Sequence, residues 1–378
     1  MTRAKPDVTL FLPSLRGGGA ERVMMDLARA MADLGRAVDV VIVNRDGAIA
    51  DDLGAGVRIV DLGVGRTAKA LPGLVAYLLR TRPPALLSTL EHTNVLAVVA
   101  TRVVPRTRVV LREANTPAQD LSSQGTKGRW LQAAMRRAYR AADAIVAVSN
   151  GVAAGLVEHL DLPEGRVRVI VNPVITPRLE EGARAPVDHP WFEAGQPPVV
   201  LAVGRLVEQK GFDLLLKAFA AARERVPCRL VLLGEGPERA ALTTQVDQLG
   251  IAQDVSMPGF AENPFPFMAR CGVFVLSSRW EGLPNVLIQA MAVGAPAVAT
   301  DCPSGPREVL DGGRHGALVP MDDVDAMARA IVEALRDGPR SLPDAWFDRY
   351  RLDRVARTYL DVLEGSSAHE DAAPGAGA

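Results

Sequence analysis

The sequence predicts an α/β protein built from two doubly wound parallel-sheet domains. Short apolar runs rich in Val, Ile and Leu alternate with segments of helical periodicity, a pattern typical of parallel strands that are covered on both faces. The pattern stops in a proline-rich interval, residues 173–197, and then starts again. The length of 378 residues also favours two domains, because single domains usually have about 100–150 residues.

The first predicted domain covers residues 1–172. Its first strand, residues 8–15, ends at a glycine-rich turn, and the helix over residues 20–34 follows because Val23, Leu27 and Met31 recur at helical spacing before Gly35. Further apolar runs predict the remaining strands of this domain, at residues 38–43, 58–62, 85–90, 108–111, 144–149 and 167–171.

The second predicted domain covers residues 198–340 and repeats the alternation. Its strands are expected at residues 199–203, 229–233, 255–257, 273–277, 297–300 and 317–319, with helices at 212–224, 237–249, 285–292 and 322–335. Residues 341–364 are expected to form terminal helices that pack back toward the first domain. Residues 365–378 are small and polar, which predicts a disordered tail.

The composition is that of an ordinary globular protein, with 48% apolar and 23% charged residues. Lys and Arg number 43 against 44 Asp and Glu, a net charge of −1. This balance argues against a globally basic nucleic-acid-binding protein and against an acidic disordered chain. We therefore expect no nucleic-acid partner.

The cysteines and the apolar runs indicate a cytoplasmic protein. Cys228, Cys271 and Cys302 lie far apart without CxxC spacing, which argues against a disulfide framework and a zinc site. No apolar run approaches the roughly 18 residues of a membrane span. Pro6 and Asp7 interrupt the first apolar stretch, so it is interpreted as a strand and not as a signal peptide.

Two cations follow the first strand of the second domain. In open α/β sheets, ligands bind beyond the carboxyl ends of the strands. Arg205 comes directly after Gly204, and Lys210 precedes Gly211 at the start of the next helix. Side chains of this type at a helix start could hold a diphosphate. The alternative is a pair of exposed surface charges.

Two further loops occupy comparable positions. Residues 277–285 follow a strand, and there Glu281 could accept hydrogen bonds from sugar hydroxyls while backbone N–H groups near Asn285 meet a phosphate; a helix-capping loop is the alternative. Gly17, Gly18 and Gly19 follow the first strand of the chain and would let a ligand approach the backbone closely, or would simply form a tight turn.

Several other catalytic patterns are missing from the sequence. Residues 234–236 come nearest to the GxGxxG fingerprint, but Arg239 stands at the third glycine position, so a nicotinamide-dependent dehydrogenase is a distant alternative. The sequence contains no GxxxxGK[ST] loop, no GxSxG elbow, no HExxH motif and no clear Asp-x-Asp metal motif.

The motifs at residues 203–205, 233–237, 281–285 and 301–306, with the glycine loop at 17–21, resemble those of the retaining GT-B glycosyltransferases of family 4. The resemblance implies two Rossmann-like domains facing a cleft, with the acceptor mainly in the first and a nucleoside-diphosphate sugar in the second. It also implies retention at the anomeric carbon by front-face attack. No metal or other cofactor is expected, because Arg205 and Lys210 would neutralise the leaving diphosphate.

The resemblance also implies roles for individual residues. Glu281 would contact hydroxyls of the donor sugar, and Arg205, Lys210 and Glu281 are the expected catalytic residues. The remaining residues expected at the donor are Gly18, Gly19, Gly204, Leu283, Pro284, Asn285 and Gln289.

Two positions depart from the family pattern. Gln289 stands where the family commonly has a second glutamate that bonds the ribose, which removes one charged acceptor but keeps an amide oxygen. Many relatives carry a histidine after the strand at residues 108–111, whereas here Arg112 and Asn115 are the polar residues expected toward the acceptor. His92 follows the preceding strand and could line the acceptor site or be structural. Glu21 is assigned to the same side.

Residues 102–140 are strongly basic, with nine basic residues against two acidic ones. Trp130, Leu131, Met135 and Tyr139 lie in the helix predicted there. A basic amphipathic helix can rest on an anionic membrane surface, so we expect a cytoplasmic protein that is peripheral on the inner face of the plasma membrane. A solvated basic face is the alternative.

The leading function is thus transfer of a sugar to a glycan or lipid-linked acceptor in the synthesis of polysaccharide, lipopolysaccharide or a related glycoconjugate. A catalytically weak sugar-nucleotide-binding scaffold and a GT-B sugar phosphorylase are the alternatives. The sequence does not predict the donor base, the sugar, the acceptor, the linkage or the oligomeric state.

Overall fold

The structure, a computed structural model, describes residues 5–15, 18–45, 56–104, 106–115 and 125–366, with the side chains of residues 125–129 excepted. The chain divides into two compact units. Unit 1 comprises Met1–Val148, Val152–Pro173 and Leu352–Ala378, and unit 2 comprises Ser149–Gly151 and Val174–Arg351.

Unit 1 is built on a sheet of seven parallel strands in the order β3-β2-β1-β4-β5-β6-β7. Every residue of β1, β2 and β4 is buried, because these runs of Val, Leu and Ile are covered on both faces. The strands are β1 (Val8–Leu12), β2 (Val38–Ile42), β3 (Val57–Asp61), β4 (Ala85–Thr89), β5 (Arg108–Glu113), β6 (Ala144–Ala147) and β7 (Val167–Val169).

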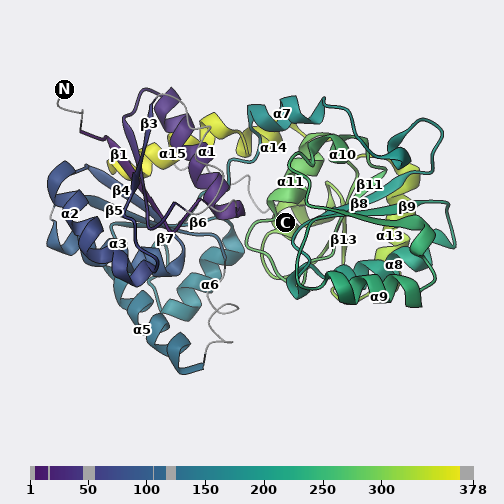
Figure 1. The fold of residues 1–378 in the computed structure, drawn as a ribbon, viewed down its shortest axis with the longest axis horizontal. Coiled ribbons are helices and arrows are strands. Elements are labelled where there is room, and N and C mark those ends of the chain that lie inside the picture. Colours follow the sequence, from purple (N-terminus) through teal and green to yellow (C-terminus); the bar gives the residue numbers. More distant parts are fainter. Residues whose placement is uncertain (1–4, 16–17, 46–55, 105, 116–124, 367–378) are drawn as a thin grey trace, which may run out of the picture. The chain divides into compact units, whose positions relative to one another are not determined.

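Two layers of helices cover this sheet. Figure 1 shows α1 (Gly19–Asp33) and α15 (Leu352–Glu364) side by side along one face, while α2 (Leu71–Thr81), α3 (Glu91–Val103) and α5 (Gly125–Ala141) form a row along the other. The short helix η2 (Thr67–Ala70) precedes α2, and α6 (Asn150–Leu160) follows β6. The helix α15 therefore completes unit 1 although it lies at the other end of the chain.

Unit 2 contains six parallel strands in the order β10-β9-β8-β11-β12-β13. This is the doubly wound arrangement, in which the chain starts at the centre and reverses direction next to β8. The strands are β8 (Val199–Val203), β9 (Arg229–Leu233), β10 (Val255–Gly259), β11 (Val273–Leu276), β12 (Ala297–Thr300) and β13 (Ala317–Val319).

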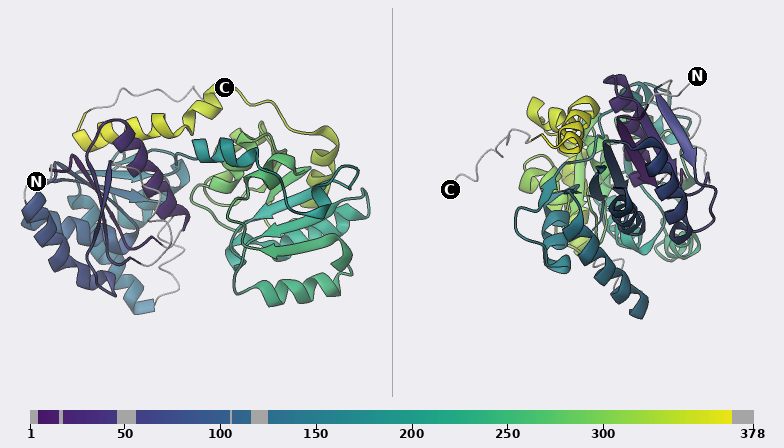
Figure 2. Two further views of the ribbon diagram at one scale, coloured as in Figure 1. Left: turned by 45° about the horizontal axis from the view of Figure 1, so that its top comes forward. Right: turned by 90° about the vertical axis from the view of Figure 1, so that its left-hand side faces the viewer.

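The core of unit 2 lies between its sheet and one helix layer. Val200, Leu230 and Val275 of the strands belong to one buried cluster with Leu215 of α8 (Phe212–Arg223) and Ile331 of α13 (Val324–Asp337). The left-hand view of Figure 2 shows these strands as one twisted sheet with helices on either side.

The α-helices of unit 2 are α7 (Pro177–Ala183), α8 (Phe212–Arg223), α9 (Arg239–Gln248), α10 (Phe265–Arg270), α11 (Asn285–Ala292), α12 (Pro306–Val309), α13 (Val324–Asp337) and α14 (Asp344–Arg349). Short 3-10 helices are η4 (Pro190–Phe192), η5 (Glu208–Lys210), η6 (Ala252–Asp254) and η7 (Asp311–Gly313).

The predicted fold class is confirmed, and each predicted strand is present at or near its predicted residues. Helix α11 has the predicted bounds. Within the proline-rich interval the structure contains α7 and η4, and of the terminal helices α14 belongs to unit 2 and α15 to unit 1. Residues 367–378 of the predicted tail lie outside the described residues.

Candidate active site

The loop between β8 and α8 places Lys210 beside the end of β11. Lys210 is the last residue of η5, and Gly211 follows it with φ +60°. A Cβ atom on Gly211 would lie 2.1 Å from the carbonyl oxygen of Ser277, so glycine is needed both for the backbone conformation and for the close approach. The loop is thus pressed against the residues that follow β11.

Lys210 and Glu281, 71 positions apart in the sequence, form an ion pair at this place. The Lys210 Nζ atom lies 2.5 Å from Glu281 Oε1, and the two side chains are 18% and 8% exposed. The hydroxyl of Ser278 donates to the same carboxylate oxygen at 2.7 Å. One oxygen of Glu281 therefore orients a cation at the carboxyl ends of β8 and β11.

Further hydrogen bonds hold the two loops together. The Ser277 hydroxyl donates to the carbonyl of Lys210 at 2.8 Å, and the Gln209 side chain donates to the carbonyl of Trp280 at 2.9 Å. The backbone N–H of Arg279 donates to the carbonyl of Gln209 at 2.8 Å. This network fixes the position of Lys210 and is independent of the ion pair itself.

A second ion pair lies on the outer side of these loops. The Arg279 guanidinium donates to both carboxylate oxygens of Asp213 at 2.8 and 2.7 Å, and it also donates to the carbonyl of Glu208. The hydrogen bond from Arg279 lowers the pKa of Asp213 below its usual value. The pair ties the first turn of α8 to the loop after β11.

Arg205 lies at the same sheet edge and is exposed. Its side chain makes no hydrogen bond or ion pair with the part of the chain that the structure describes. Gly204 next to it is covered by the loop after β9, because the N–H of Gly204 donates to Leu233 at 2.9 Å and a Cβ on Gly234 would lie 1.8 Å from the Gly204 oxygen. Arg205 is thus an exposed cation that follows a residue whose backbone is held in place by the loop after β9.

The loop after Glu281 leads into α11. Leu283 and Pro284 are buried, whereas Asn285, the first residue of α11, and Gln289 one turn later are partly exposed. The first turn of a helix offers backbone N–H groups that have no partner within the helix. Nearby, burial raises the pKa of Cys302 to about 12, with the Glu281 carboxylate as a further cause, so this cysteine is a thiol at neutral pH.

The expected residues of unit 1 lie at the carboxyl edge of its sheet. Gly18 and Gly19 are exposed at the start of α1, while Arg16 and Gly17 lie outside the described residues. Glu21 accepts from the N–H of Gly18 at 2.7 Å and from the Ser14 hydroxyl at 3.0 Å. Glu21 therefore caps the start of α1, with both carboxylate oxygens in use.

His92 and Asn115 are exposed after β4 and β5, which are adjacent strands, but Arg112 is not. The strand β5 extends to Glu113, two residues beyond the predicted end, so Arg112 belongs to the strand and is completely buried. Its guanidinium donates to Thr89 Oγ1 at 3.0 Å and to Asn172 Oδ1 at 2.6 Å. The structure therefore makes Arg112 a positioning residue for the ends of β4 and β7, and not a residue that reaches an acceptor.

Glu113 is also buried and belongs to the same polar interior. It accepts from the Asn94 amide at 2.8 Å and from the hydroxyl of Tyr139. These contacts join β5 to α3 and α5. The polar residues that follow the apolar part of β5 therefore support the edge of the sheet from inside unit 1.

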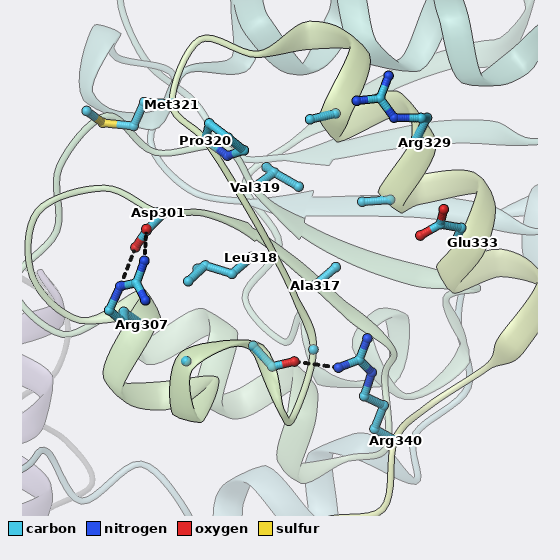
Figure 3. Close-up of a pocket in the computed structure, with 15 residues that line it drawn as sticks. Asp301, Arg307, Ala317, Leu318, Val319, Pro320, Met321, Arg329, Glu333 and Arg340 are labelled. Carbon is cyan, nitrogen blue, oxygen red and sulfur yellow. Dashed lines mark hydrogen bonds and ion pairs between the residues drawn. The ribbon is translucent and has the colours of Figure 1, made fainter. Parts of the chain in front are cut away.

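A separate hollow of about 790 Å³ runs along β13 at the edge of the sheet of unit 2. Figure 3 shows the Asp301–Arg307 ion pair at one end, and Arg340, which donates to the carbonyl of Gly313, at the other. None of the site residues predicted from the sequence lines it. The hollow is therefore distinct from the Lys210–Glu281 site.

The residues that the structure describes contain no group of three or more His, Cys, Asp or Glu side chains arranged to hold a metal ion. None of the described helices combines the length and the apolar character that a bilayer crossing requires.

Sequence reasoning missed the residues that support the site. Ser278 holds Glu281, and Gln209, Arg279 and Asp213 join the two loops. Ser278 could have been suspected, because it follows a strand directly. The Arg279–Asp213 pair gave no signal, since its members are 66 positions apart.

Comparison with known families identifies the class of protein. The family model described as "Glycosyltransferase Family 4" matches residues 17–178, and the model described as "Glycosyl transferases group 1" matches residues 197–337. The two matches follow one another along the chain and correspond to the two sheets. The protein is a glycosyltransferase of the GT-B fold, and it belongs to the group 1, family 4 glycosyltransferases.

Curated relatives are also glycosyltransferases. The chain is 28% identical over 281 residues to N-acetylgalactosamine-N,N'-diacetylbacillosaminyl-diphospho-undecaprenol 4-alpha-N-acetylgalactosaminyltransferase of Campylobacter jejuni, covering 72% of this chain and 74% of the relative. It is 37% identical over 201 residues to the lipopolysaccharide core biosynthesis glycosyltransferase LpsE of Rhizobium meliloti, covering 53% and 56%. The match thus spans just over half the length of LpsE.

Solved structures share the fold. HepE of Anabaena, determined with UDP and glucose, superposes with a TM-score of 0.74 at 18% identity and covers 95% of this chain and all of its own. WaaG, a glycosyltransferase involved in lipopolysaccharide biosynthesis, superposes with a TM-score of 0.72 at 17% identity, covering 95% of this chain and all of its own. At this identity the likeness shows the fold.

Proposed function

We propose that this protein is a retaining glycosyltransferase that moves a sugar from a nucleoside-diphosphate sugar to a glycan or lipid-linked acceptor. The observation that carries the proposal is the Lys210–Glu281 pair, which lies with the exposed Arg205 at the carboxyl ends of β8 and β11. This edge is the ligand-binding edge of a doubly wound sheet, on either side of the strand-order reversal.

In the proposed reaction, Arg205 and Lys210 stabilise the diphosphate as it leaves. Negative charge grows on the diphosphate when its bond to the anomeric carbon breaks, and positioned cations stabilise that charge without reorganising. The positive end of the α11 helix dipole adds to the attraction for a phosphate. Because two side chains supply the positive charge, the proposed reaction needs no metal ion.

Glu281 serves the donor sugar in this proposal. Its Oε1 atom accepts from Lys210 and from Ser278, and the carboxylate has a second oxygen that can accept from a sugar hydroxyl. One residue would thus fix both the sugar and the cation that stabilises the leaving group. Gln289, one turn after Asn285 in α11, would bond the ribose through its amide in this proposal.

The chemical class of the acceptor is inferred from the names of two relatives. The Campylobacter relative is named for a diphospho-undecaprenol acceptor and LpsE for the lipopolysaccharide core. We therefore place this protein in polysaccharide or lipopolysaccharide-type synthesis, with a growing glycan, free or linked to a lipid diphosphate, as acceptor. His92 and Asn115 at the exposed edge of unit 1 are the residues proposed to meet it.

Donor binding is tested first by thermal unfolding with UDP-, GDP-, ADP- and dTDP-sugars and the bare nucleotides. A donor present at about 100 times its Kd should add about 2.7 kcal/mol to the free energy of unfolding. The preferred donor is then used for transfer to lipid-linked glycan acceptors, with and without EDTA, and the configuration of the product linkage is determined by NMR.

The decisive variant combines Arg205→Ala with Lys210→Ala and should abolish transfer while the protein remains folded. Its matched control combines Lys217→Ala with Arg336→Ala, two exposed cations on α8 and α13, and should keep full activity. Wild-type turnover in the first variant would overturn the site assignment. Donor binding without transfer to any acceptor would favour the scaffold function, dependence on inorganic phosphate would favour a phosphorylase, and loss of activity in EDTA would contradict the metal-free reaction.

A further inference from the structure

The positive charge of this protein is concentrated in one part of unit 1. Residues 62–142 contain thirteen Lys and Arg against three Asp and Glu, in a chain whose net charge is −1. One of these three acids, Glu113, is buried inside the unit. The basic region is therefore twice as long as the stretch that the sequence pattern alone singles out, residues 102–140.

The fold places this region on one face of the sheet. The helices α2, α3 and α5 all come from it and form one row (Figure 1), and together their sequences contain a single acid, Glu91. On the opposite face, α1 and α15 carry four arginines and six carboxylates. The two faces of unit 1 thus have opposite charge.

The basic face also exposes apolar side chains. Of the seven large hydrophobic residues that are exposed in the described chain, three lie on α2 and α3. Val99 and Val103 are 43% and 57% exposed and stand one turn apart on α3, and Leu79 near the end of α2 is 49% exposed. Helices α2 and α3 pack against each other, and all three side chains lie in the C-terminal halves of these neighbouring helices.

Exposed arginines accompany the apolar residues on the same two helices. Arg80, Arg82, Arg102 and Arg106 are all exposed at the ends of α2 and α3. Arg102 donates to the carbonyl of Ala141, which leaves its charge uncompensated. We name this surface the α2–α3 patch; it consists of Leu79, Arg80, Arg82, Val99, Arg102, Val103 and Arg106. Arg140 is left out because it forms an ion pair with Asp161.

We propose that the α2–α3 patch docks on the surface of an anionic lipid bilayer. Apolar side chains that enter the headgroup region, surrounded by arginines that meet lipid phosphates, are the combination such a surface binds. The charge is complementary to anionic headgroups and the patch carries no carboxylate. The proposed site thus overlaps the expected stretch, residues 102–140, only at its beginning and extends to the end of α2.

Within unit 1, the patch lies away from the residues proposed to meet the acceptor. Helices that follow parallel strands begin at the carboxyl edge of the sheet and end at its amino edge. The patch lies toward the ends of α2 and α3, whereas His92 lies at the start of α3. Substitutions in the patch should therefore change membrane binding and leave transfer to a water-soluble acceptor unchanged.

The test is sedimentation of the full chain with vesicles of phosphatidylcholine containing 30% phosphatidylglycerol, and with pure phosphatidylcholine. Binding is expected with the anionic vesicles and should weaken when salt rises from roughly 0.1 to 0.5 M. In the charge variant, Arg80→Glu with Arg106→Glu, each arginine lost should weaken binding at least about five-fold. The apolar variant, Val99→Ser with Val103→Ser, should also weaken binding at constant charge.

The matched control replaces two arginines outside the patch, Arg336→Glu with Arg357→Glu, and makes the same change in net charge. Thermal unfolding and transfer to a soluble acceptor confirm that each variant is folded. Equal binding by the charge variant and this control, equal binding to both kinds of vesicle, or no binding at all would overturn the proposal. A dimer that dissociates in the apolar variant would instead assign Val99 and Val103 to contacts between copies of the chain.

Discussion

The carboxylate of Glu281 receives two donors on one oxygen, and this arrangement gives the residue a double role. Substitution by Gln keeps the shape but removes the charge that holds Lys210. Because the pair is mostly buried, Glu281→Gln should lower stability by about 1–3 kcal/mol and turnover by about 100-fold. Thermal unfolding and initial rates at saturating donor measure the two effects.

Glu235→Gln is the matched control for this prediction. Glu235 pairs with Arg239 four residues later, but its side chain is 54% exposed and solvent screens the pair, so the loss of stability should be much smaller than for Glu281→Gln. If both variants lose the same stability and keep the same activity, Glu281 has no special role in holding Lys210.

Gln289 tests how far the family pattern applies to this chain. A glutamate at this partly exposed position of α11 would restore a charged acceptor for a ribose hydroxyl. We expect Gln289→Glu to bind the nucleotide equally well or up to roughly ten-fold more tightly, as measured by calorimetry. Clearly weaker binding would show that residue 289 does not meet the ribose.

At the scale of residues, the sequence predicted which side chains occupy the strand ends but not how they pair. Lys210 and Glu281 were each predicted from their own loop, and their ion pair depends on β8 and β11 being neighbours. Arg112 was misplaced because β5 continues for two polar residues beyond its apolar run. In the sequence, polar residues at the end of a strand look like the start of a loop. Their hydrogen-bond partners, which would show that they are buried, come from distant segments.

Among the elements, α8 and the loop after β11 are held together by Asp213 and Arg279. The hydrogen bond lowers the pKa of Asp213 in the folded protein, whereas the unfolded chain has a value of about 3.9. The pair therefore contributes stability fully above about pH 4–5, and this contribution is lost as the pH falls through the lowered pKa. Since the carboxylate is 44% exposed, the contribution should be below about 1 kcal/mol.

Asp213→Asn should accordingly be less stable than the wild type at pH 7, and this difference should be smaller near about pH 3. Urea unfolding at both pH values gives the difference. Asp247→Asn on α9, an exposed position, is the control and should show no such convergence. A stability difference of the same size at both pH values would contradict an electrostatic role for the pair.

The elements themselves differ in how well the sequence indicates them. Buried parallel strands are continuous apolar runs, so all the strands were predicted, with ends shifted by a few residues. The helices α7 and α10 have only seven and six residues and begin near prolines. Such short segments show less than two turns of periodicity, and no helix was predicted at either of them.

At the scale of the whole molecule, the stability of unit 1 depends on α15, the last helix of the described chain. Val355, Tyr359, Leu360 and Leu363 of α15 are buried in unit 1, and each buried side chain of this kind contributes roughly 1.5–3 kcal/mol. Removal of residues 352–378 should therefore loosen unit 1 while unit 2 still binds the nucleotide. Limited proteolysis and calorimetry on the truncated chain measure both outcomes.

A chain that lacks residues 367–378 alone provides the control, because it retains α15. It should resist protease as the full chain does. If unit 1 is equally resistant without α15, the helix is a passive cover and its buried side chains contribute little.

The distribution of charge over the surface is also a property that only the folded molecule displays. A net charge of −1 suggests no particular partner, because the acids of the other segments cancel the thirteen bases of residues 62–142. The fold gathers α2, α3 and α5 on one face and separates the two signs in space. Composition averages over the chain, whereas a surface depends on which elements lie side by side.

The position of α15 has a consequence for the order in which the two units fold during synthesis on the ribosome. The strands of unit 1 leave the exit tunnel first, but the helix that covers β4 and β5 beside α1 emerges after every segment of unit 2. The nascent first half must therefore wait, with part of its apolar sheet uncovered, while the second half is translated and folds. The earliest synthesised part of the chain is the last to be finished, and it is the part that chaperones would have to protect.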